Sequence, residues 1–508
     1  MVIAKLKRVR NSFLDVSRLP SEILGDIFSR NAGFRGGFGG LGKKSHNFLL
    51  VCHRWFEIAS HAPEVWSFWG NTFQDWKKFY LRYPTGPVDL VLNGDTLEAD
   101  DFYDVHEIQD ALRDRAKRDK LRRIHLRSGR AALLGAILSF LTSHRETRFS
   151  SVETILIINE GSHPTQLDVS DFFARHRFPK LRYLELIGCQ TLSWEVTMGQ
   201  TSALSTLYIC YPDVSQLPTT SSQPFSMIAC NPLLRELRLS RFALPREAKE
   251  SSLRAVLPHL DMLELTGSPR HVFWLLQRLD HPKNMNYLKL DLESCKPDDV
   301  PGNIGPYLCD YLQHHQRSRS GLAIVILSSR DSVTIFIGNV SGMDSSRQTR
   351  VETLVELSFR PRSVSQTIGE VTLSLVARSL EEKIWYLGVH GGLVNVTEIS
   401  TRLPHIRVLH FNRGDLHRIF SNPAHGMDMV MFPALRRITL DSITVADGDS
   451  WSSLTTFLHR HTSSGNRLDL LETIGIHPTR PEVEEDIKRA VREYKKIRPP
   501  WRTPMDGS

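Results

Sequence analysis

Cysteine is scarce in this chain. The 508 residues include six cysteines, and no two of them form a Cys-x-x-Cys pair. This scarcity excludes a disulfide-rich scaffold, and the spacing argues against a zinc site. We therefore expect reduced, buried thiols beside apolar neighbours, at Cys52, Cys189, Cys210, Cys230, Cys295 and Cys309.

Long apolar runs and targeting segments are also lacking. No run approaches the roughly 18 apolar residues that a membrane-spanning helix needs, and no secretory signal opens the sequence. We expect a protein without membrane contact, located inside the cell in the cytoplasm or the nucleus. The glycosylation sequons at Asn339 and Asn395 would then be chance matches.

No block of charge of a single sign stands out. The net charge is +8, but 64 Lys and Arg residues alternate with 56 Asp and Glu residues along the chain. Interspersed charge is typical of a solvated surface, so no nucleic-acid partner is expected. The densest basic cluster, Lys5, Lys7, Arg8 and Arg10, predicts a flexible basic terminus over residues 1–14.

Residue patterns that carry catalysis or bind metal are missing. Histidines lie close together at His314 and His315 and at His459 and His461, but both pairs fall at predicted helix ends, where histidine suits the helix dipole. The aspartates at 298–299, 447 and 449 are interpreted as loop carboxylates. We expect a non-catalytic protein without a cofactor or a metal.

A glycine-rich segment at residues 31–45 has a pattern of its own. It fits Gly37-x-Gly39-x-x-Gly42 and so approaches a phosphate-binding loop. However, Lys44 stands where such a loop has the Ser or Thr that holds magnesium, and no buried strand precedes the glycines. The segment is predicted to be a mobile insertion whose role the sequence does not reveal.

Apolar residues, in contrast, make up 41% of the chain, so several domains or one elongated repeat domain are expected at this length. Near the start, apolar spacing predicts helices at 19–28 and 48–60, and a third short helix that begins at Pro63 and carries Trp66 and Trp69. Three helices this short cannot bury all of their large side chains among themselves. The surplus predicts a protein partner.

These segments resemble the F-box in the order of their motifs: Leu-Pro-x-Glu-Ile-Leu-x-x-Ile-Phe at 19–28, Leu-Val-Cys-x-Arg-Trp at 50–55 and Ala-x-x-x-Pro-x-x-Trp at 59–66. The resemblance implies a domain over residues 15–70 that docks on the small Skp-type adaptor of cullin-RING ubiquitin ligases. The alternative, that the same residues only form the core of a helical bundle, stays open. The candidate adaptor contacts are Leu19, Pro20, Ile23, Leu24, Ile27, Val51, Cys52 and Trp55.

Aromatic residues recur at helical spacing directly after this domain, from Phe73 to Tyr83. They predict a linker helix over residues 71–86. Such a helix would fix the angle between the adaptor-binding domain and the region that follows.

The rest of the chain repeats a short pattern, apolar-x-x-apolar-x-apolar, mostly at intervals of roughly 22 to 37 residues. Each occurrence predicts a strand, and residues 88–92 predict a strand before the first of them. Amphipathic stretches at 131–141, 270–279, 304–314 and 451–459 predict helices between strands. The pattern occurs at Leu121/Ile124/Leu126, Val152/Ile155/Ile157, Leu181/Leu184/Leu186, Leu204/Leu207/Ile209, Leu234/Leu237/Leu239, Leu260/Leu263/Leu265, Met285/Leu288/Leu290, Leu322/Val325/Leu327, Leu354/Leu357/Phe359, Ile384/Leu387/Val389, Ile406/Leu409/Phe411, Leu435/Ile438/Leu440 and Leu471/Ile474/Ile476.

Units of one strand and one helix bury their apolar faces only by stacking, which places parallel strands on the inner wall of a solenoid. The pattern resembles F-box proteins with degenerate leucine-rich repeats, of the kind abundant in mushroom-forming fungi. The resemblance implies an α/β fold in which an amino-terminal three-helix F-box is followed by a curved, irregular leucine-rich-repeat solenoid over residues 87–480. The consensus asparagine after each strand is mostly missing, so the turns must be satisfied in another way.

Two segments depart from the repeat. Residues 322–328 and 333–338, separated by a polar turn, predict a β-hairpin whose function the sequence does not reveal. Residues 481–498 predict a helix with acidic residues first and basic residues last, which would cap the final repeat, although an interaction helix has the same pattern. Residues 499–508 are expected to form a flexible tail.

With these resemblances, the sequence predicts a substrate-recognition subunit of an SCF-type cullin-RING ubiquitin ligase. The F-box would bind the Skp-type adaptor, and through it a cullin, while the repeat domain would bind a target protein that the sequence does not identify. An alternative is a non-catalytic repeat scaffold whose F-box serves outside a ligase. A third, less favoured class is an enzyme that uses the glycine-rich loop.

Overall fold

A computed structural model gives the structure of parts of the chain. The predicted basic terminus, most of the glycine-rich segment, the linker helix and the tail lie outside the described residues. The structure describes residues 19–32, 51–62, 68–70, 87–93, 113–142, 147–161, 167–190, 203–211, 223–242, 254–282, 285–295, 307–308, 310–311, 322–328, 333–343, 349–361, 384–390, 400, 403–413, 416–420, 431–445, 448–476, 478 and 480–497.

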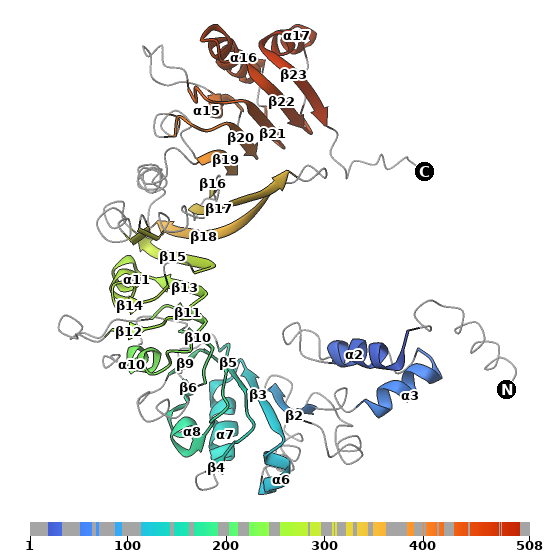
Figure 1. Cartoon of the computed structure of the whole chain (residues 1–508), viewed down its shortest axis with the longest axis vertical. Coiled ribbons are helices and arrows are strands. Elements are labelled where there is room, and N and C mark those ends of the chain that lie inside the picture. The colour runs from blue at the N-terminus through green and yellow to red at the C-terminus, as the bar shows by residue number, and fades with distance from the viewer. Residues whose placement is uncertain are drawn as a thin grey trace, which may run out of the picture. The chain divides into compact units, whose positions relative to one another are not determined.

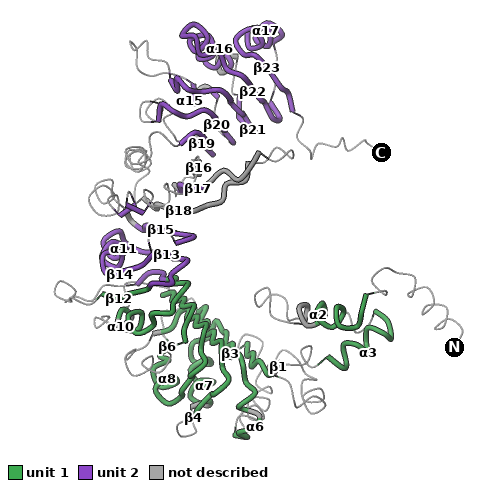
Figure 2. The backbone as a smooth tube through the Cα atoms, viewed as in Figure 1, with its two compact units in different colours: residues 1–238, 245–257 green, residues 239–244, 258–508 purple. Residues whose placement is uncertain are grey.

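The described residues form a mixed α/β structure in which most strand pairs are parallel, which confirms the predicted α/β class. Two compact units divide the chain (Figure 2). Unit 1 comprises residues 1–238 and 245–257, and unit 2 comprises residues 239–244 and 258–508. None of the helices in the described parts has the length and apolar character that crossing a bilayer requires.

Unit 1 begins with two helices, α2 (Ser21–Ala32) and α3 (His53–His61). Both fall where apolar spacing predicts them. The third predicted helix is wrong at Trp69, because Phe68–Gly70 forms strand β1, which pairs in parallel with β2 (Val88–Asn93). An extended segment there satisfies the hydrogen-bonding groups along one edge of β2, which a short helix would leave without strand partners.

The main strands of unit 1 lie side by side in parallel register, in the order β1, β2, β3, β5, β8 and β10. Residues of the apolar pattern are buried throughout this row; Leu121, Ile155, Leu184 and Leu207 have 0 to 1% of their surface exposed. The strands after β2 are β3 (Leu121–Ser128), β4 (Thr147–Arg148), β5 (Thr154–Asn159), β6 (Leu167–Asp168), β7 (His176–Arg177), β8 (Tyr183–Ile187), β9 (Cys189–Gln190), β10 (Thr206–Cys210), β11 (Glu236–Ser240) and β12 (Ala255–Val256).

Helices pack on one face of these strands. Helix α7 (Ala131–Thr142) lies where residues 131–141 predict it and contacts β3 (Figure 1). Helix α8 (Ser170–Arg175) follows β6 and packs beside α7. Among the described residues of the unit, the other helices are α6 (Arg115–Arg118) and α10 (Gln223–Ala229).

Backbone hydrogen bonds pair the polar groups of several turns at the ends of the strands. Gly188, directly after β8, has φ +66° and donates its N–H to the carbonyl of Cys210, the last residue of the next strand, at 2.8 Å. In unit 2, Arg413, Ser442 and Gly475 also have positive φ. Each donates its N–H to the carbonyl of the last residue of the next strand. Because of these bonds, the turns leave no strand-end amide unpaired at these positions.

The last residue of β5 is an asparagine, Asn159. Its side-chain amide donates to the carbonyl of Gly188 at 3.1 Å and accepts from the N–H of Gly161 at 3.3 Å. The side chain is buried, so both bonds replace contacts with water.

In unit 2, hydrogen bonds join β13, β15, β18, β17, β16, β19, β20, β21, β22 and β23 in that order. Helices α11 and α16 fall where residues 270–279 and 451–459 predict helices; the four described residues of 304–314 are also helical. The strands are β13 (Met262–Gly267), β14 (Leu279–Asp280), β15 (Tyr287–Cys295), β16 (Leu322–Ser328), β17 (Val333–Met343), β18 (Thr349–Pro361), β19 (Ile384–His390), β20 (Val408–Asn412), β21 (Arg437–Asp441), β22 (Leu468–Ile474) and β23 (Val491–Ile497), and the helices are α11 (Pro269–Leu276), α15 (Leu416–Phe420), α16 (Gly448–Ser463) and α17 (Pro481–Ala490).

The predicted hairpin is confirmed and belongs to a larger meander. Strand β17 is antiparallel to both β16 and β18. The meander lies in the row in reverse chain order, because β18 pairs with β15 while β16 pairs with β19. The connections from β15 to β16 and from β18 to β19 therefore each pass across two strands.

Two predictions near the carboxyl end are corrected. In β22 the three buried pattern positions are Leu468, Leu471 and Thr473, not Leu471, Ile474 and Ile476. The predicted helix 481–498 ends at Ala490, and residues 491–497 form β23, which pairs in parallel with β22. The open edge of β22 offers backbone partners that outweigh the helical preference of this Lys- and Glu-containing segment.

Candidate functional site: the helix pair

The candidate site is built on helices α2 and α3, called here the helix pair. Leu24, Phe28 and Ala59 are fully buried, and the ring of Phe28 lies 5.0 Å from that of Trp55 between centroids. The Arg54 guanidinium donates to the backbone carbonyl of Leu19 at 2.8 Å, which ties α3 to the residues that lead into α2. The sequence motif therefore brings its two helical parts into contact.

The eight predicted adaptor contacts fall into three classes of exposure. Pro20, Ile23 and Val51 are exposed, Ile23 by 49% and Val51 by 52%. Leu24 is fully buried, so it supports the surface from beneath and offers no contact area of its own. The half-buried residues are Leu19, Ile27, Cys52 and Trp55.

Phe56 was not among the predicted contacts, yet 44% of its surface is exposed. It follows Trp55 directly, and two neighbouring residues of a helix face in different directions. Because Trp55 packs against Phe28, Phe56 is turned away from that contact. Adjacent aromatic residues in a short helix are the signal that could have identified it.

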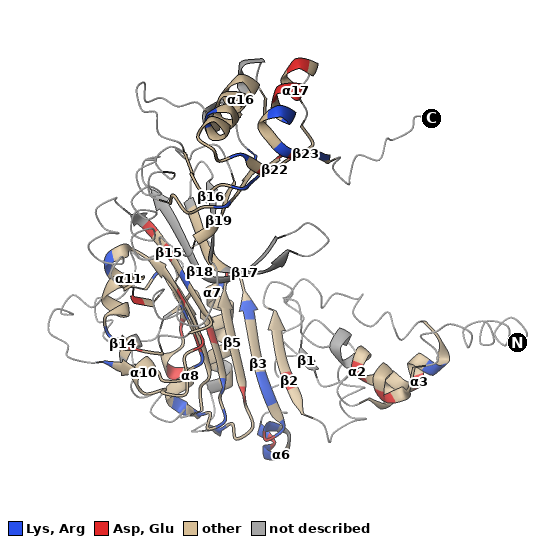
Figure 3. Ribbon diagram, turned by 45° about the horizontal axis from the view of Figure 1, so that its top comes forward, with Lys and Arg blue, Asp and Glu red and all other residues tan. Residues whose placement is uncertain are grey.

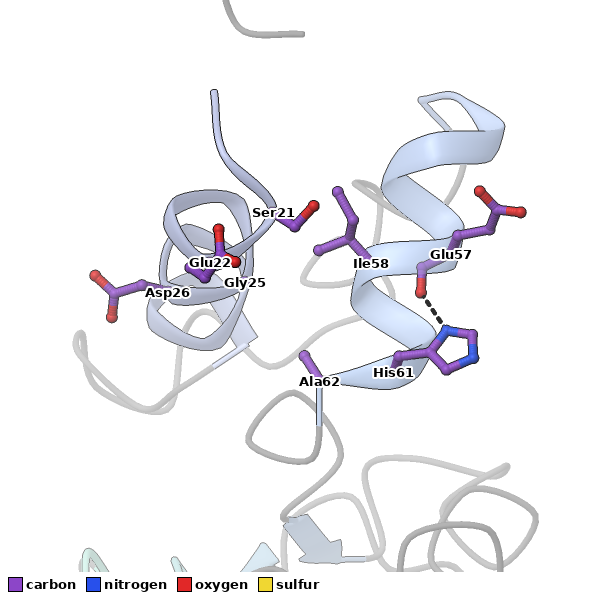
Figure 4. Close-up of a pocket in the computed structure, with 8 residues that line it drawn as sticks. All are labelled: Ser21, Glu22, Gly25, Asp26, Glu57, Ile58, His61 and Ala62. Carbon is purple, nitrogen blue, oxygen red and sulfur yellow. Dashed lines mark hydrogen bonds between the residues drawn. The ribbon is translucent and has the colours of Figure 1, made fainter. Parts of the chain in front are cut away.

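A hollow of about 680 Å³ lies between the two helices (Figure 4). Three exposed acidic residues are among those that line it, Glu22, Asp26 and Glu57; the carboxylates of Asp26 and Glu57 point outward, to its rim. His61 is fixed at its rim, because its Nδ1 lies 2.7 Å from the carbonyl oxygen of Glu57 (Figure 4). The rim presents hydrogen-bond acceptors and negative charge, which suit a basic side chain. The other lining residues are Ser21, Gly25, Ile58 and Ala62.

Two buried titratable groups with shifted pKa values lie within the strand row of unit 1. Burial raises the pKa of Asp89 on β2 to about 6, although Arg123 and Arg122 oppose the shift. Burial lowers the pKa of His125 on β3 to about 3, with a smaller contribution from Arg127. Both side chains are at least 95% buried, so they act on stability.

A second polar cluster lies on β19 to β22 in unit 2. The rings of His390 and His410 are 5.9 Å apart, and the Tyr386 hydroxyl lies 3.1 Å from Nδ1 of His410. Burial lowers the pKa of His410 to about 4, and it also lowers that of His390. Glu472 accepts from Thr439 at 3.2 Å. Neutral histidines and a hydrogen-bonded carboxylate connect neighbouring strands here.

Among the residues considered for metal binding, His459 is exposed, and Asp449 lies in α16, so its prediction as a loop carboxylate is wrong. His461 is buried, and its ring nitrogens lie 2.9 Å and 2.7 Å from the carbonyls of Asn466 and Met431. Within the described ranges, no group of three His, Cys, Asp or Glu side chains is arranged to hold a metal ion. His314, His315 and the aspartates 298, 299 and 447 lie outside the described residues.

Cys52, Cys189, Cys210 and Cys230 are free thiols. Cys189 is buried as predicted and Cys52 and Cys210 are half-buried, but Cys230 is exposed, so the prediction of a buried thiol is wrong there. Burial raises the pKa of the Cys189 thiol, which makes it a poor nucleophile. In the described parts of the chain, the helix pair is thus where large exposed apolar side chains and a lined hollow occur together. No model of a known protein family matches the chain, and no curated protein has a similar sequence.

Proposed function

We propose that the chain is the substrate-recognition subunit of an SCF-type cullin-RING ubiquitin ligase. In this proposal residues 15–70 form an F-box that binds a Skp-type adaptor, and through it a cullin. A curved, irregular leucine-rich-repeat solenoid over residues 87–480 binds the target protein. The chain itself carries no catalytic step; ubiquitin transfer belongs to the other subunits.

The observation that carries the proposal is the exposed apolar surface of the helix pair. Ile23 and Val51 lie on the two motif segments that resemble the F-box, and about half of each side chain is exposed. Covering such a residue with an apolar partner surface gains about 1 kcal/mol or more. Several such residues together favour a lasting complex.

The strand rows support the second half of the proposal. In unit 1, side chains that alternate with the buried pattern residues are half-buried, including Tyr183, Glu185 and Tyr208. They lie on the strand face opposite the buried pattern residues, where successive strands add contact area. Aromatic and charged side chains on a rigid strand row suit recognition of a protein surface.

The test is co-purification of the full-length chain with a Skp-type adaptor. Changing Val51 to Asp places a charge in the proposed contact and should abolish adaptor binding. Val256 is the matched control: it is a valine of similar exposure, 54% against 52% for Val51, and it lies in β12. Val256→Asp should retain the adaptor.

A second variant, Leu19→Ala with Pro20→Ala, should also lose the adaptor while the thermal unfolding of the chain stays unchanged. Recovery of a cullin together with a ubiquitin-modified target separates a ligase subunit from a scaffold that uses its F-box elsewhere. Equal adaptor binding by the wild type and Val51→Asp would refute the proposed contact.

A further inference from the structure

The residues that lead into the strands of unit 1 form a continuous line, called here the leading edge. Backbone hydrogen bonds fix its order: Glu153 N–H donates to the carbonyl of Arg122 at 2.8 Å, and Arg182 N–H donates to that of Glu153 at 2.8 Å. Ser205 N–H then donates to Arg182 at 2.8 Å, and Arg235 N–H to Ser205 at 2.7 Å. The line therefore runs Arg122, Glu153, Arg182, Ser205, Arg235.

Arginine occupies every second position of this line. Neighbouring strands of a sheet are about 4.8 Å apart, so the three arginines recur at about 10 Å. Arg182 and Arg235 are exposed, and Arg122 is half-buried. Figure 3 shows further Lys and Arg, in blue, on α6 and β3. The leading edge is a regular row of cations.

Two of the three arginines are uncompensated by any described residue, whereas Nε of the third, Arg122, lies 3.8 Å from Oδ1 of the buried Asp89. Arg182, Arg235 and the exposed Lys180 form no ion pair or side-chain hydrogen bond with any described residue. Arg148 and Arg177 are both exposed and lie opposite each other in the register of β4 and β7. Like charges placed side by side across strands are unfavourable, so an external anion would stabilise this arrangement.

The other end of the same strands differs in charge. At the carboxyl end of β3, Arg127 donates to Glu160 through both Nε and Nη2, at 2.8 Å and 2.5 Å. Next to it, the end of β5 is occupied by the neutral, hydrogen-bonded Asn159. At the carboxyl end of β3, Arg127 is thus neutralised by Glu160, whereas Arg182 and Arg235 at the leading edge have no such partner among the described residues.

We propose that the leading edge of unit 1 binds an acidic polypeptide segment that carries a carboxylate at every third residue. A polyproline II helix has three residues per turn and rises about 3.1 Å per residue, so its side chains at i, i+3 and i+6 recur at about 9 Å. This repeat is close to the spacing of Arg122, Arg182 and Arg235. The guanidinium group forms paired hydrogen bonds with a carboxylate, which favours this anion.

A peptide fits better than a nucleic acid. A nucleic-acid strand carries a phosphate about every 3.4 Å along the duplex axis, and Glu153, between Arg122 and Arg182, would repel such a dense row of charge. The nearby Phe149 and Phe178 are buried and stacked on each other at 5.3 Å, so neither ring is free to stack on a base. The inference rests on the proposed function only in naming the peptide as part of the target.

The test is fluorescence polarisation of the full-length chain with a labelled peptide of about twelve residues made of Glu-Pro-Pro repeats. The wild type should bind it, and more weakly as the salt concentration rises. The double variant Arg182→Glu with Arg235→Glu should weaken binding at least about tenfold. Both side chains are exposed, so the variant should fold as the wild type does. Thermal unfolding of the variant checks this.

Unit 2 offers a matched control. Arg407 and Arg436 are exposed and hold corresponding positions before β20 and β21, where Arg436 N–H donates to the carbonyl of Arg407 at 2.8 Å. Arg407→Glu with Arg436→Glu changes the net charge by the same amount and should leave peptide binding within about twofold of the wild type.

Three outcomes would overturn the inference: no binding of the peptide by the wild type, an equal loss in both double variants, or tighter binding of single-stranded DNA of equal charge. A peptide with the same number of glutamates in one block should bind more weakly than the regular repeat. The assay contains no adaptor, and Val51→Asp should bind the peptide as the wild type does. Failure of this inference and failure of the proposed function are thus distinguishable.

Discussion

The helix pair and the strand row of unit 1 treat their apolar residues in opposite ways. In the row, pattern residues such as Leu184 and Leu207 have no exposed surface. In the helix pair, Ile23 and Phe56 remain 49% and 44% exposed, and Val51, two residues before α3, is 52% exposed. The difference teaches that apolar residues in the row contribute to folding, whereas those on the helix pair are available for binding.

The largest expected effect is the loss of a pattern residue from the row. Leu184→Ala should lower the free energy of unfolding by about 2 to 5 kcal/mol, because it removes a fully buried side chain and leaves a cavity. Ile23→Ala, in the helix pair, should change it by less than about 0.5 kcal/mol. Chemical denaturation of both variants measures the difference, and similar losses in the two would contradict the comparison.

Replacing a glycine by alanine should have opposite effects on stability in the strand row and in the helix pair. Gly188 has φ +66°, and an added Cβ would lie 2.3 Å from the carbonyl oxygen of Asn159. Gly188→Ala should therefore cost about 2 kcal/mol. Gly25, within α2, has no atom within 4 Å of such a Cβ, so Gly25→Ala should stabilise the chain by about 0.5 to 1 kcal/mol. Thermal unfolding of the two alanine variants tests both signs.

The two regions also differ in the exposure of their carboxyl side chains. Asp89 in the row is only 4% exposed, whereas Glu22, Asp26 and Glu57 of the helix pair are exposed. The pKa of folded Asp89 is about 6 against an ordinary 3.8. Between these values the folded chain keeps a proton that the unfolded chain releases. Stability should fall as pH rises through this window, by on the order of 3 kcal/mol, and level off above it.

Asp89→Asn tests this pH dependence. The variant cannot ionise at this position, so its stability relative to the wild type should increase from pH 4 to pH 6. His125, whose pKa burial lowers to about 3, has the opposite trend, but it is present in both proteins and cancels in the difference. Urea denaturation across this pH range measures the difference in stability between the variant and the wild type. A difference that does not change with pH would show that Asp89 is not the cause of the pH dependence.

Sequence spacing located most strands of the repeated pattern, but it assigned the residues of β1 and β23 to helices. Alternation in β8, where Leu184 and Leu186 are buried between half-buried neighbours, is a local signal and needs no knowledge of the partner strands. It failed in β22 because Thr473 occupies an apolar position; the threonine is fully buried, and its hydroxyl lies 3.3 Å from that of Tyr494.

Pairing order could not be predicted from spacing. Residues 322–328 and 354–359 carry the same pattern as the parallel strands, yet they belong to the reversed meander. Which strand pairs with which depends on where the intervening chain passes, and periodicity carries no information about that. The non-glycine residues with positive φ, such as Arg413 and Ser442, give no sequence signal for the same reason.

The candidate site was predictable in part. Ile23 and Val51 were identified as contacts and are exposed, although their binding role stays a prediction. The burial of Leu24 and the exposure of Phe56 depend on how α2 packs against α3, which the helical period of either helix alone does not specify.

Strand β23 determines how far the row of unit 2 can be extended by another molecule. Arg492, Glu493, Lys495 and Lys496 are exposed along it, and among the described strands it pairs with β22 alone. A strand from a second copy would have to bring its backbone against these hydrated charges and strip their water. Filament growth from this end of the row is thereby opposed, and the charged edge keeps neighbouring copies from joining sheet to sheet.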